Sequence, residues 1–309
     1  MRIVLSILFI CCFIKGNAFQ VEPALPILKD YDKVRDFTMN NNQTEAYVSA
    51  QSNLEEKSVI LRISKENGVW SRVDIASFSG KYRDLEPFLT PDNLKLFFVS
   101  NRPLNQEGEL KDVDIWYVER TSITSDWSEP KNIGAPVNTE ADEFYPSIAK
   151  NGNLYFTSVG HNAMGEDDIF VSEYKNGTYT TPVALKGGVN TKSYEYNSFI
   201  SPNEDYLIFG GYNRKDGLGS GDLYISFRNN DNTWTLAKNM GDKINSKYMD
   251  FCPFVTQSGE EMYFTSRRSN LESTKGVTSV KNLLEEFNSY ENGFSRIYKT
   301  KFSLLEFKN

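Results

Sequence analysis

Residues 142–160 read DEFYPSIAKNGNLYFTSVG, and EDDIFVSEYKNG (166–177) and TYTTPVALKGGVN (178–190) follow them. The same order of segments occurs earlier, as DLEPFLTPDNLKLFFVS (84–100), DVDIWYV (112–118) and DWSEPKNIGAPVN (126–138). It occurs again later, as YEYNSFISPNEDYLIFGG (194–211), SGDLYISF (220–227) and NTWTLAKNMGDKIN (232–245). Asp114, Asp168 and Asp222 open matching apolar segments at intervals of 54 residues. A fixed period of this size, with several strand signals in each unit, is typical of a β-propeller.

The sequence pattern predicts four strands in each unit. The second strand is a continuous apolar run, as expected for a strand that is covered on both faces. Five units are legible, over residues 34–80, 83–138, 142–190, 194–245 and 249–305. The last unit ends before a fourth strand, and residues 19–30 resemble the missing piece. We therefore predict a five-bladed all-β propeller closed by an N-terminal strand, with six blades as the alternative.

The first 18 residues have the pattern of a cleaved signal peptide. Arg2 precedes an apolar run too short to span a bilayer, and small residues lead up to Ala18. We expect export to the periplasm or the medium, with residues 19–309 forming a single domain, as a monomer. No later stretch predicts a membrane span.

The predicted mature chain is acidic. Removing Arg2 and Lys15 from 34 basic residues leaves 32 against 41 acidic ones, a net charge of −9. An acidic chain repels phosphate backbones, so nucleic-acid binding is not expected. Cys252 is the one cysteine left after cleavage. A small buried hydrophobe is the preferred interpretation of this residue, over a reactive thiol.

The longest departure from the repeat is an insertion over residues 269–293. Within it, residues 280–287 (VKNLLEEF) place apolar side chains at helical spacing and predict a short amphipathic helix. The insertion could be a binding loop or a cap packed on its blade.

The segments PDNLKLFFVSNR (91–102) and DIWYV (114–118) resemble the TolB-type, WD-like β-propeller repeat. The resemblance implies a periplasmic or secreted propeller that binds proteins or glycans, and a minority of similar propellers are carbohydrate-active lyases or hydrolases. The chain lacks the N-terminal α/β domain of TolB itself and has five units, where TolB has six.

Acidic residues begin the first strand of four units, and Arg35 is placed at the matching position of the first unit. Radial repetition would set these side chains around the channel mouth, where the carboxylates could hold a divalent cation such as calcium or contact sugar hydroxyls. The alternative, which we favour, is that each one caps a turn or bonds to the next blade. No metal site or other cofactor is otherwise indicated. The acidic residues are Asp84, Glu143, Glu195 and Asp250.

Basic or imidazole side chains follow the second strands, at Arg102, His161, Arg214 and Arg268. An arginine cluster could recognise the carboxylates of an acidic glycan, but we favour ion pairs within each blade to the third-strand aspartates. His161 is the only histidine and could act as a general base; without a second histidine or a cysteine partner it forms no dyad or zinc site.

The sequence favours a non-enzymatic module of the bacterial envelope that binds a protein or a polysaccharide. The alternative is a glycoside hydrolase or polysaccharide lyase with its site at the channel mouth, where Glu143 and Glu195 could supply general acid and base. A deep pocket with two nearby carboxylates ringed by Arg or Tyr would favour the enzyme, and a closed channel would favour the binding module.

Overall fold

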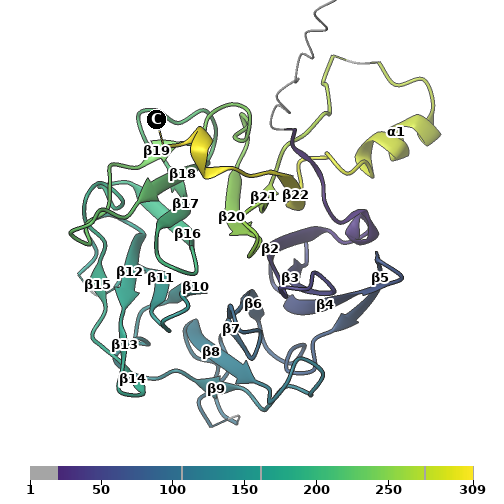
Figure 1. The fold of residues 1–309 in the computed structure, drawn as a ribbon. Coiled ribbons are helices and arrows are strands. Elements are labelled where there is room, and N and C mark those ends of the chain that lie inside the picture. The colour runs from purple at the N-terminus through teal and green to yellow at the C-terminus, as the bar shows by residue number, and fades with distance from the viewer. Residues whose placement is uncertain (1–19, 106, 161, 275, 309) are drawn as a thin grey trace, which may run out of the picture.

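The computed structural model describes residues 20–308 except 106, 161 and 275. The predicted signal peptide, Phe19 and His161 therefore lie outside the described residues. Five antiparallel four-stranded sheets surround a common axis (Figure 1). The prediction of a five-bladed propeller is confirmed, and the six-bladed alternative is excluded.

The strands follow the repeat along the chain. Blade 1 contains β2 (Lys33–Met39), β3 (Glu45–Gln51), β4 (Ser58–Glu66) and β5 (Val69–Ile75). Blade 2 contains β6 (Asp84–Leu89), β7 (Lys95–Ser100), β8 (Asp114–Glu119) and β9 (Lys131–Asn132). Blade 3 contains β10 (Glu143–Ile148), β11 (Leu154–Ser158), β12 (Asp168–Ser172) and β15 (Val183–Ala184), and the separate hairpin of β13 (Tyr174–Lys175) and β14 (Thr178–Tyr179). Blade 4 contains β16 (Tyr194–Ile200), β17 (Tyr206–Tyr212), β18 (Asp222–Phe227) and β19 (Lys238–Asn239). Blade 5 contains β20 (Asp250–Val255), β21 (Glu261–Ser266), β22 (Arg296–Lys301) and β1 (Glu22–Pro23).

The N-terminal segment closes the ring, as predicted. In β1, Glu22 pairs with Lys299 and Pro23 with Tyr298, so the earliest described strand is the fourth strand of the last blade. Leu25 and Leu28, which flank and end the 3-10 helix η1 (Pro26–Leu28), are 0% and 2% exposed. The segment therefore adds both a strand and buried apolar side chains to blade 5.

The core lies between the blades, on both faces of the second strands. β3, β7, β11, β17 and β21 are buried along nearly their whole length, because each is covered by a neighbouring blade on either side. These runs are the continuous apolar stretches that the sequence assigns to strands covered on both faces.

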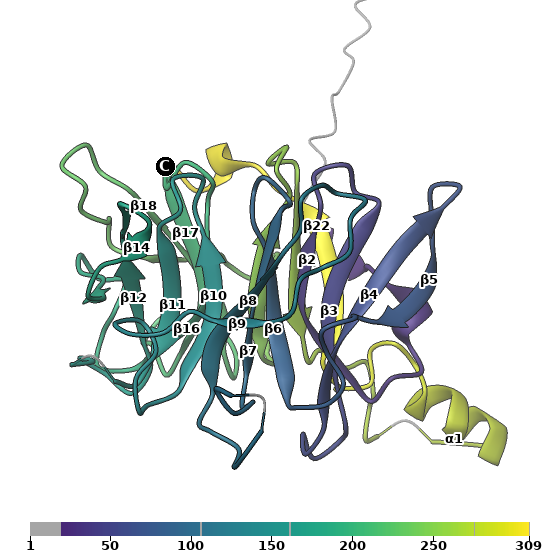
Figure 2. The same ribbon diagram turned by 90° about the horizontal axis from the view of Figure 1, so that it is seen from below.

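The antiparallel order gives the disc two different faces (Figure 2). The loop face carries the links between second and third strands, including residues 101–113 and 267–295. The turn face carries the tight turns between first and second strands, such as residues 90–94 and 150–153. The helix α1 (Val280–Phe287) forms over the predicted residues and projects from the loop-face side of blade 5. None of its residues is buried, so it is not a cap packed on the blade. A 3-10 helix, η2 (Leu304–Glu306), lies near the C-terminus. None of the helices in the described part of the chain is long and apolar enough to cross a membrane.

Candidate functional site

The four repeated carboxylates are bonded within their own blades. Asp84, Glu143, Glu195 and Asp250 are each 0% exposed. Each accepts a hydrogen bond from a hydroxyl four or five residues earlier in the incoming loop: from Ser79 (2.8 Å), Thr139 (2.6 Å), Thr191 (2.7 Å) and Ser246 (2.8 Å). These are the contacts of the turn-capping role. A ligand-binding role for these four side chains stays a prediction.

The predicted arginine clamps form, but with other partners than expected. Arg102 contacts Asp84 at 2.6 Å, and Arg268 contacts Asp250 at 2.8 Å. Arg214 lies 3.7 Å from Glu195. The arginines therefore pair with the acid that begins the first strand, and the prediction of third-strand aspartates as partners is wrong. The third-strand aspartates instead bind neighbouring groups: Asp168 accepts from the backbone N–H groups of Met164 and Gly165. Asp222 accepts from the backbone N–H of Leu218 and from the side-chain amide of Asn239.

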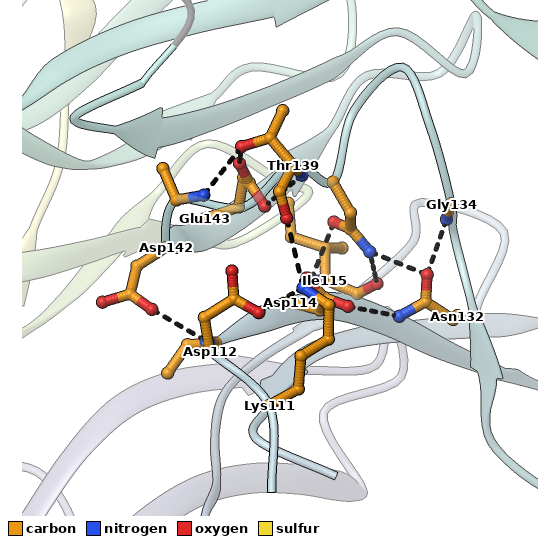
Figure 3. Close-up of polar contacts among 12 residues, drawn as sticks. Lys111, Asp112, Asp114, Ile115, Asn132, Gly134, Thr139, Asp142 and Glu143 are labelled. Atoms are coloured by element: carbon orange, nitrogen blue, oxygen red, sulfur yellow. Dashed lines mark hydrogen bonds and ion pairs between the residues drawn. The ribbon is translucent and has the colours of Figure 1, made fainter. Parts of the chain in front are cut away.

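Acidic side chains gather where blade 2 meets blade 3 (Figure 3). Lys111 contacts Asp112 and, at 2.9 Å, Asp114, which also accepts from Asn132 at 2.8 Å. Burial, with a smaller contribution from the charges of Asp114 and Asp112, raises the pKa of Glu143 to about 7 against the lowering effect of its hydrogen bonds from Thr139. Across the described ranges, no three or more His, Cys, Asp or Glu side chains gather in a way that could hold a metal ion, so calcium binding stays a prediction.

The strand register moves Arg35 away from the repeated acids. Val34 pairs with Ala50 in blade 1 as Asp84 pairs with Ser100 in blade 2, so Val34 occupies the matching position and the placement of Arg35 there is wrong. The acid is missing from blade 1, and the repeat is therefore easily misaligned by one residue. That single residue matters because side chains alternate between the two faces of a strand.

A bulge interrupts the first strand of every blade. Its residue has a positive φ in all five copies: Asp36 (62°), Glu86 (58°), Tyr145 (48°), Asn197 (51°) and Cys252 (51°). A bulged residue leaves the regular ladder and its side chain is redirected. Two of the five side chains are carboxylates and the other three are a phenol, an amide and a thiol, whereas an acid repeats two residues earlier in four of the blades.

Three of these bulge residues meet one guanidinium group near the axis. Nε of Arg35 donates to Oδ1 of Asp36 at 2.7 Å, and Nη2 of Arg35 donates to Oε1 of Glu86 at 2.8 Å. The thiol of Cys252 donates to Oδ1 of Asp36 at 2.9 Å. The backbone N–H of Tyr145 donates to Oε2 of Glu86 at 2.7 Å. We call these five residues, contributed by blades 1, 2, 3 and 5, the axial cluster.

The side chains of the axial cluster are almost entirely buried. Asp36 is 1% exposed and Glu86 4%, while the Arg35 side chain, which covers the ring of Phe251, is 16% exposed. Burial raises the pKa of Glu86 to about 7; Arg35 lowers it and Asp36 raises it again. Burial also raises the pKa of the Cys252 thiol, and Asp36 adds to that shift. Cys252 is thus a protonated, 0% exposed side chain, which confirms the buried interpretation of this residue.

Phenylalanines close the channel on the turn-face side of the axial cluster. Phe88, Phe199 and Phe254 occupy one register position of three first strands, with ring centroids 6.4 Å apart for Phe88 and Phe199 and 5.7 Å for Phe199 and Phe254. Thr38 and Ser147 take the same position in the other two blades. These rings therefore cover the axial cluster on the turn-face side.

The sequence analysis missed the axial carboxylates Asp36 and Glu86. A usable signal is present, because the bulge residue stands two after the repeated acid and directly before Pro87, Pro146 or Pro253 in three units. Its chemistry is variable, so a search for repeated residues passes over it.

Comparisons with known proteins place the chain in a structural class. No family model matches, and no curated protein matches in sequence. Solved structures do match over most of the chain. An α-L-arabinofuranosidase from Lactobacillus brevis has a TM-score of 0.53 at 13% identity, covering 89% of this chain and 91% of its own. A GH62 hydrolase in complex with xylotriose also scores 0.53, at 10% identity, covering 92% and 97%. The arabinanase Arb43A of Bacillus subtilis scores 0.50 at 12% identity, covering 89% and 96%. At these identities the likeness concerns the fold: the chain is a five-bladed β-propeller of the architecture found in these proteins. The resemblance to TolB-type repeats stays a hypothesis.

Proposed function

We propose that this protein is a carbohydrate-active enzyme, a glycoside hydrolase whose site is the axial cluster. The observation that supports this most directly is a pair of carboxyl groups, Asp36 and Glu86, held by the single guanidinium of Arg35. Glycoside hydrolysis needs one carboxyl group that is protonated near neutral pH and a second that acts as base or nucleophile. The names of the solved structures with this fold, arabinofuranosidases and an arabinanase, further support a polysaccharide substrate.

The roles follow from the environments of the two groups. Burial raises the pKa of Glu86 to about 7, although in this state its Oε1 accepts from Arg35 and its Oε2 from Tyr145. Glu86 would take up a proton and act as the general acid once substrate displaces Arg35. It would protonate the glycosidic oxygen of the leaving group, and Asp36 would supply the second carboxylate. Substrate would have to displace Arg35, the most exposed side chain over the pair, because Asp36 and Glu86 are 1% and 4% exposed.

The test is release of reducing ends from linear arabinan, arabinoxylan and polygalacturonate. The Glu86→Gln variant should lose activity by at least about 100-fold, the lower range for removing a general acid. The control is Glu285→Gln, which changes an exposed glutamate of α1 and should leave activity unchanged. A cooperatively folded protein that cleaves none of the three polysaccharides, or a fully active Glu86→Gln variant, contradicts the proposal.

A non-catalytic binding module is the second candidate, and one observation favours it. The channel is closed, by the axial cluster on one side and by Phe88, Phe199 and Phe254 on the other. Retention of a polysaccharide without release of reducing ends would support this candidate. Export to the bacterial envelope stays a prediction for either function, tested by N-terminal sequencing of the protein recovered outside the cytoplasm.

A further inference from the structure

A groove lies on the turn face between blades 2 and 3, away from the loop-face approach to the axial cluster. Its volume is about 670 Å³, within the range of ligand sites. Both blades line it: Tyr117 comes from β8 of blade 2, and Tyr174 and Tyr179 come from the hairpin β13–β14 of blade 3. Three tyrosines from two blades therefore meet in one depression.

The hairpin that carries two of these tyrosines pairs separately from the main sheet of its blade. Among the described strands, β13 and β14 form the one separate two-stranded sheet. Their turn is Asn176-Gly177, both at positive φ (53° and 84°), the combination that favours a tight hairpin. The register sets Tyr174 opposite Tyr179, with ring centroids 5.0 Å apart and planes at 54°. Blade 1 has the equivalent turn, Asn67-Gly68 at φ 51° and 80°, at the tip of β4–β5, with Lys65 opposite Trp70. The hairpin therefore belongs to the repeat, and the facing pair of tyrosines is what distinguishes it in blade 3.

The turn between β10 and β11, in the same blade, leaves room for the ring of Tyr174. Gly152 has φ +91°, and a Cβ built on it would lie 3.0 Å from Cδ1 of Tyr174. Glycine at this position permits both the backbone conformation and the close approach of the ring. Tyr174 nevertheless remains 41% exposed, so it is held in place and still presents a surface to the groove.

The lining suits a chain of hydroxylated rings. Tyrosine offers an apolar ring face and a polar hydroxyl, which together match the C–H face and the hydroxyl edge of a sugar. Lys95 lies over the Tyr117 ring at 5.1 Å, and Lys150 and Asn151 add exposed polar groups at the edge. Asp92, the lining carboxylate, already accepts from the Thr90 hydroxyl at 2.6 Å and the Leu94 N–H at 3.0 Å.

We propose that this groove binds an oligosaccharide segment, with Tyr174 as its stacking surface. The groove shares Thr90, Pro91, Ile148 and Pro202 with a small pocket of about 60 Å³ at the axis, so a bound chain would run from the rim toward the centre. The inference rests on the carbohydrate part of the proposed function and does not depend on catalysis. The groove would hold a polysaccharide while the axial cluster acts from the opposite face.

The test is affinity electrophoresis and titration calorimetry of the full mature chain with linear arabinan, arabinoxylan and polygalacturonate. Tyr174→Ala should weaken binding of the retained polysaccharide about tenfold or more, as truncation of an aromatic anchor does. Tyr174→Phe keeps the ring and should bind within about twofold of the parent. The matched control is Tyr212→Ala, because Tyr212 is 46% exposed and packs on Tyr194 with centroids 5.7 Å apart. It should bind as the parent does.

Two outcomes would overturn the inference: a parent protein that binds none of the three polysaccharides, or a Tyr174→Ala variant that binds as tightly as Tyr212→Ala. The groove and the proposed catalytic site are tested separately by measuring polysaccharide binding and release of reducing ends in both Glu86→Gln and Tyr174→Ala. Glu86→Gln should keep the groove affinity, and Tyr174→Ala should keep release of reducing ends from short oligosaccharides. Binding that depends on Tyr174 without any release contradicts the hydrolase alone, and release without such binding contradicts the groove alone.

Discussion

Removing the buried leucine of the N-terminal closing segment should destabilise the whole propeller. Leu25 is 0% exposed. It directly follows Ala24, whose backbone N–H donates to the carbonyl of Ile297 at 3.0 Å. Truncating a fully buried leucine to alanine costs about 3 kcal/mol, through lost apolar burial and the cavity left behind. For a domain of this size, with about 2.1 cal/mol/K of unfolding entropy per residue, that loss lowers Tm by roughly 5 °C. A chain that begins at Lys29 also loses Leu28 and the β1 pairing, so its loss should be larger.

Thermal and urea unfolding followed by circular dichroism would measure the effect, against a parent that begins at Gln20. Leu54→Ala is the matched control, because Leu54 is 79% exposed and its truncation should change stability by less than about 0.5 kcal/mol. A chain starting at Lys29 that melts at the parent's temperature would show that the segment does not close the ring. The strand assignment of residues 22–23 would then be wrong.

Three further outcomes follow from buried polar groups. Burial raises the pKa of Glu86 to about 7, so between the two pKa values the folded state holds a proton that the unfolded state releases. The stability that this group contributes is fully present below about pH 4.5 and is lost as the pH rises through 7. The Tm of Glu86→Gln should therefore fall less than the Tm of the parent between about pH 5 and pH 8. Asn190→Ala removes an amide that accepts from the N–H of Ile169 at 2.9 Å and donates to its carbonyl at 2.9 Å, and chemical denaturation should show a loss of about 2 kcal/mol, with no change for the exposed Asn230→Ala. Cys252 is 0% exposed and burial raises its pKa, so iodoacetamide should modify it only after denaturation; rapid labelling of the native protein would contradict that geometry.

The fold could be predicted because its determinants repeat. Glu143, Glu195 and Asp250 begin first strands, and the period of 54 residues separates Asp114, Asp168 and Asp222. Because the last unit lacked a fourth strand, residues 19–30 could be assigned as the segment that completes the last blade and closes the ring. The helix over residues 280–287 was visible from its apolar spacing, but its lack of packing was not, because spacing does not say whether a partner surface exists.

The site could not be predicted in the same way. A bulge inserts one residue into the ladder and turns the following side chains to the other face. The proline that follows Glu86 marks its position but does not by itself specify a positive φ, and Asp36 is followed by Phe37. Blade 1 has Val34 where the other blades have an acid, so aligning units by their charges placed Arg35 one position away from its true register. The groove tyrosines escaped notice because Tyr174 and Tyr117 come together only across the boundary between two blades.

The five blades also provide an internal comparison of what the fold needs. Positions with the same chemistry in several blades, such as Asn138, Asn190 and Asn245, bind the backbone of their own third strand and serve the blade itself. The axial bulge differs in every blade, so the fold does not require its chemistry. Burying charged groups there is costly, and well-packed apolar residues often give equal or greater stability than a buried ion pair. Arg35, Asp36 and Glu86 thus form a buried ion-pair group that the repeat of the fold does not call for, and this is the physical reason to test them for a role in binding or catalysis.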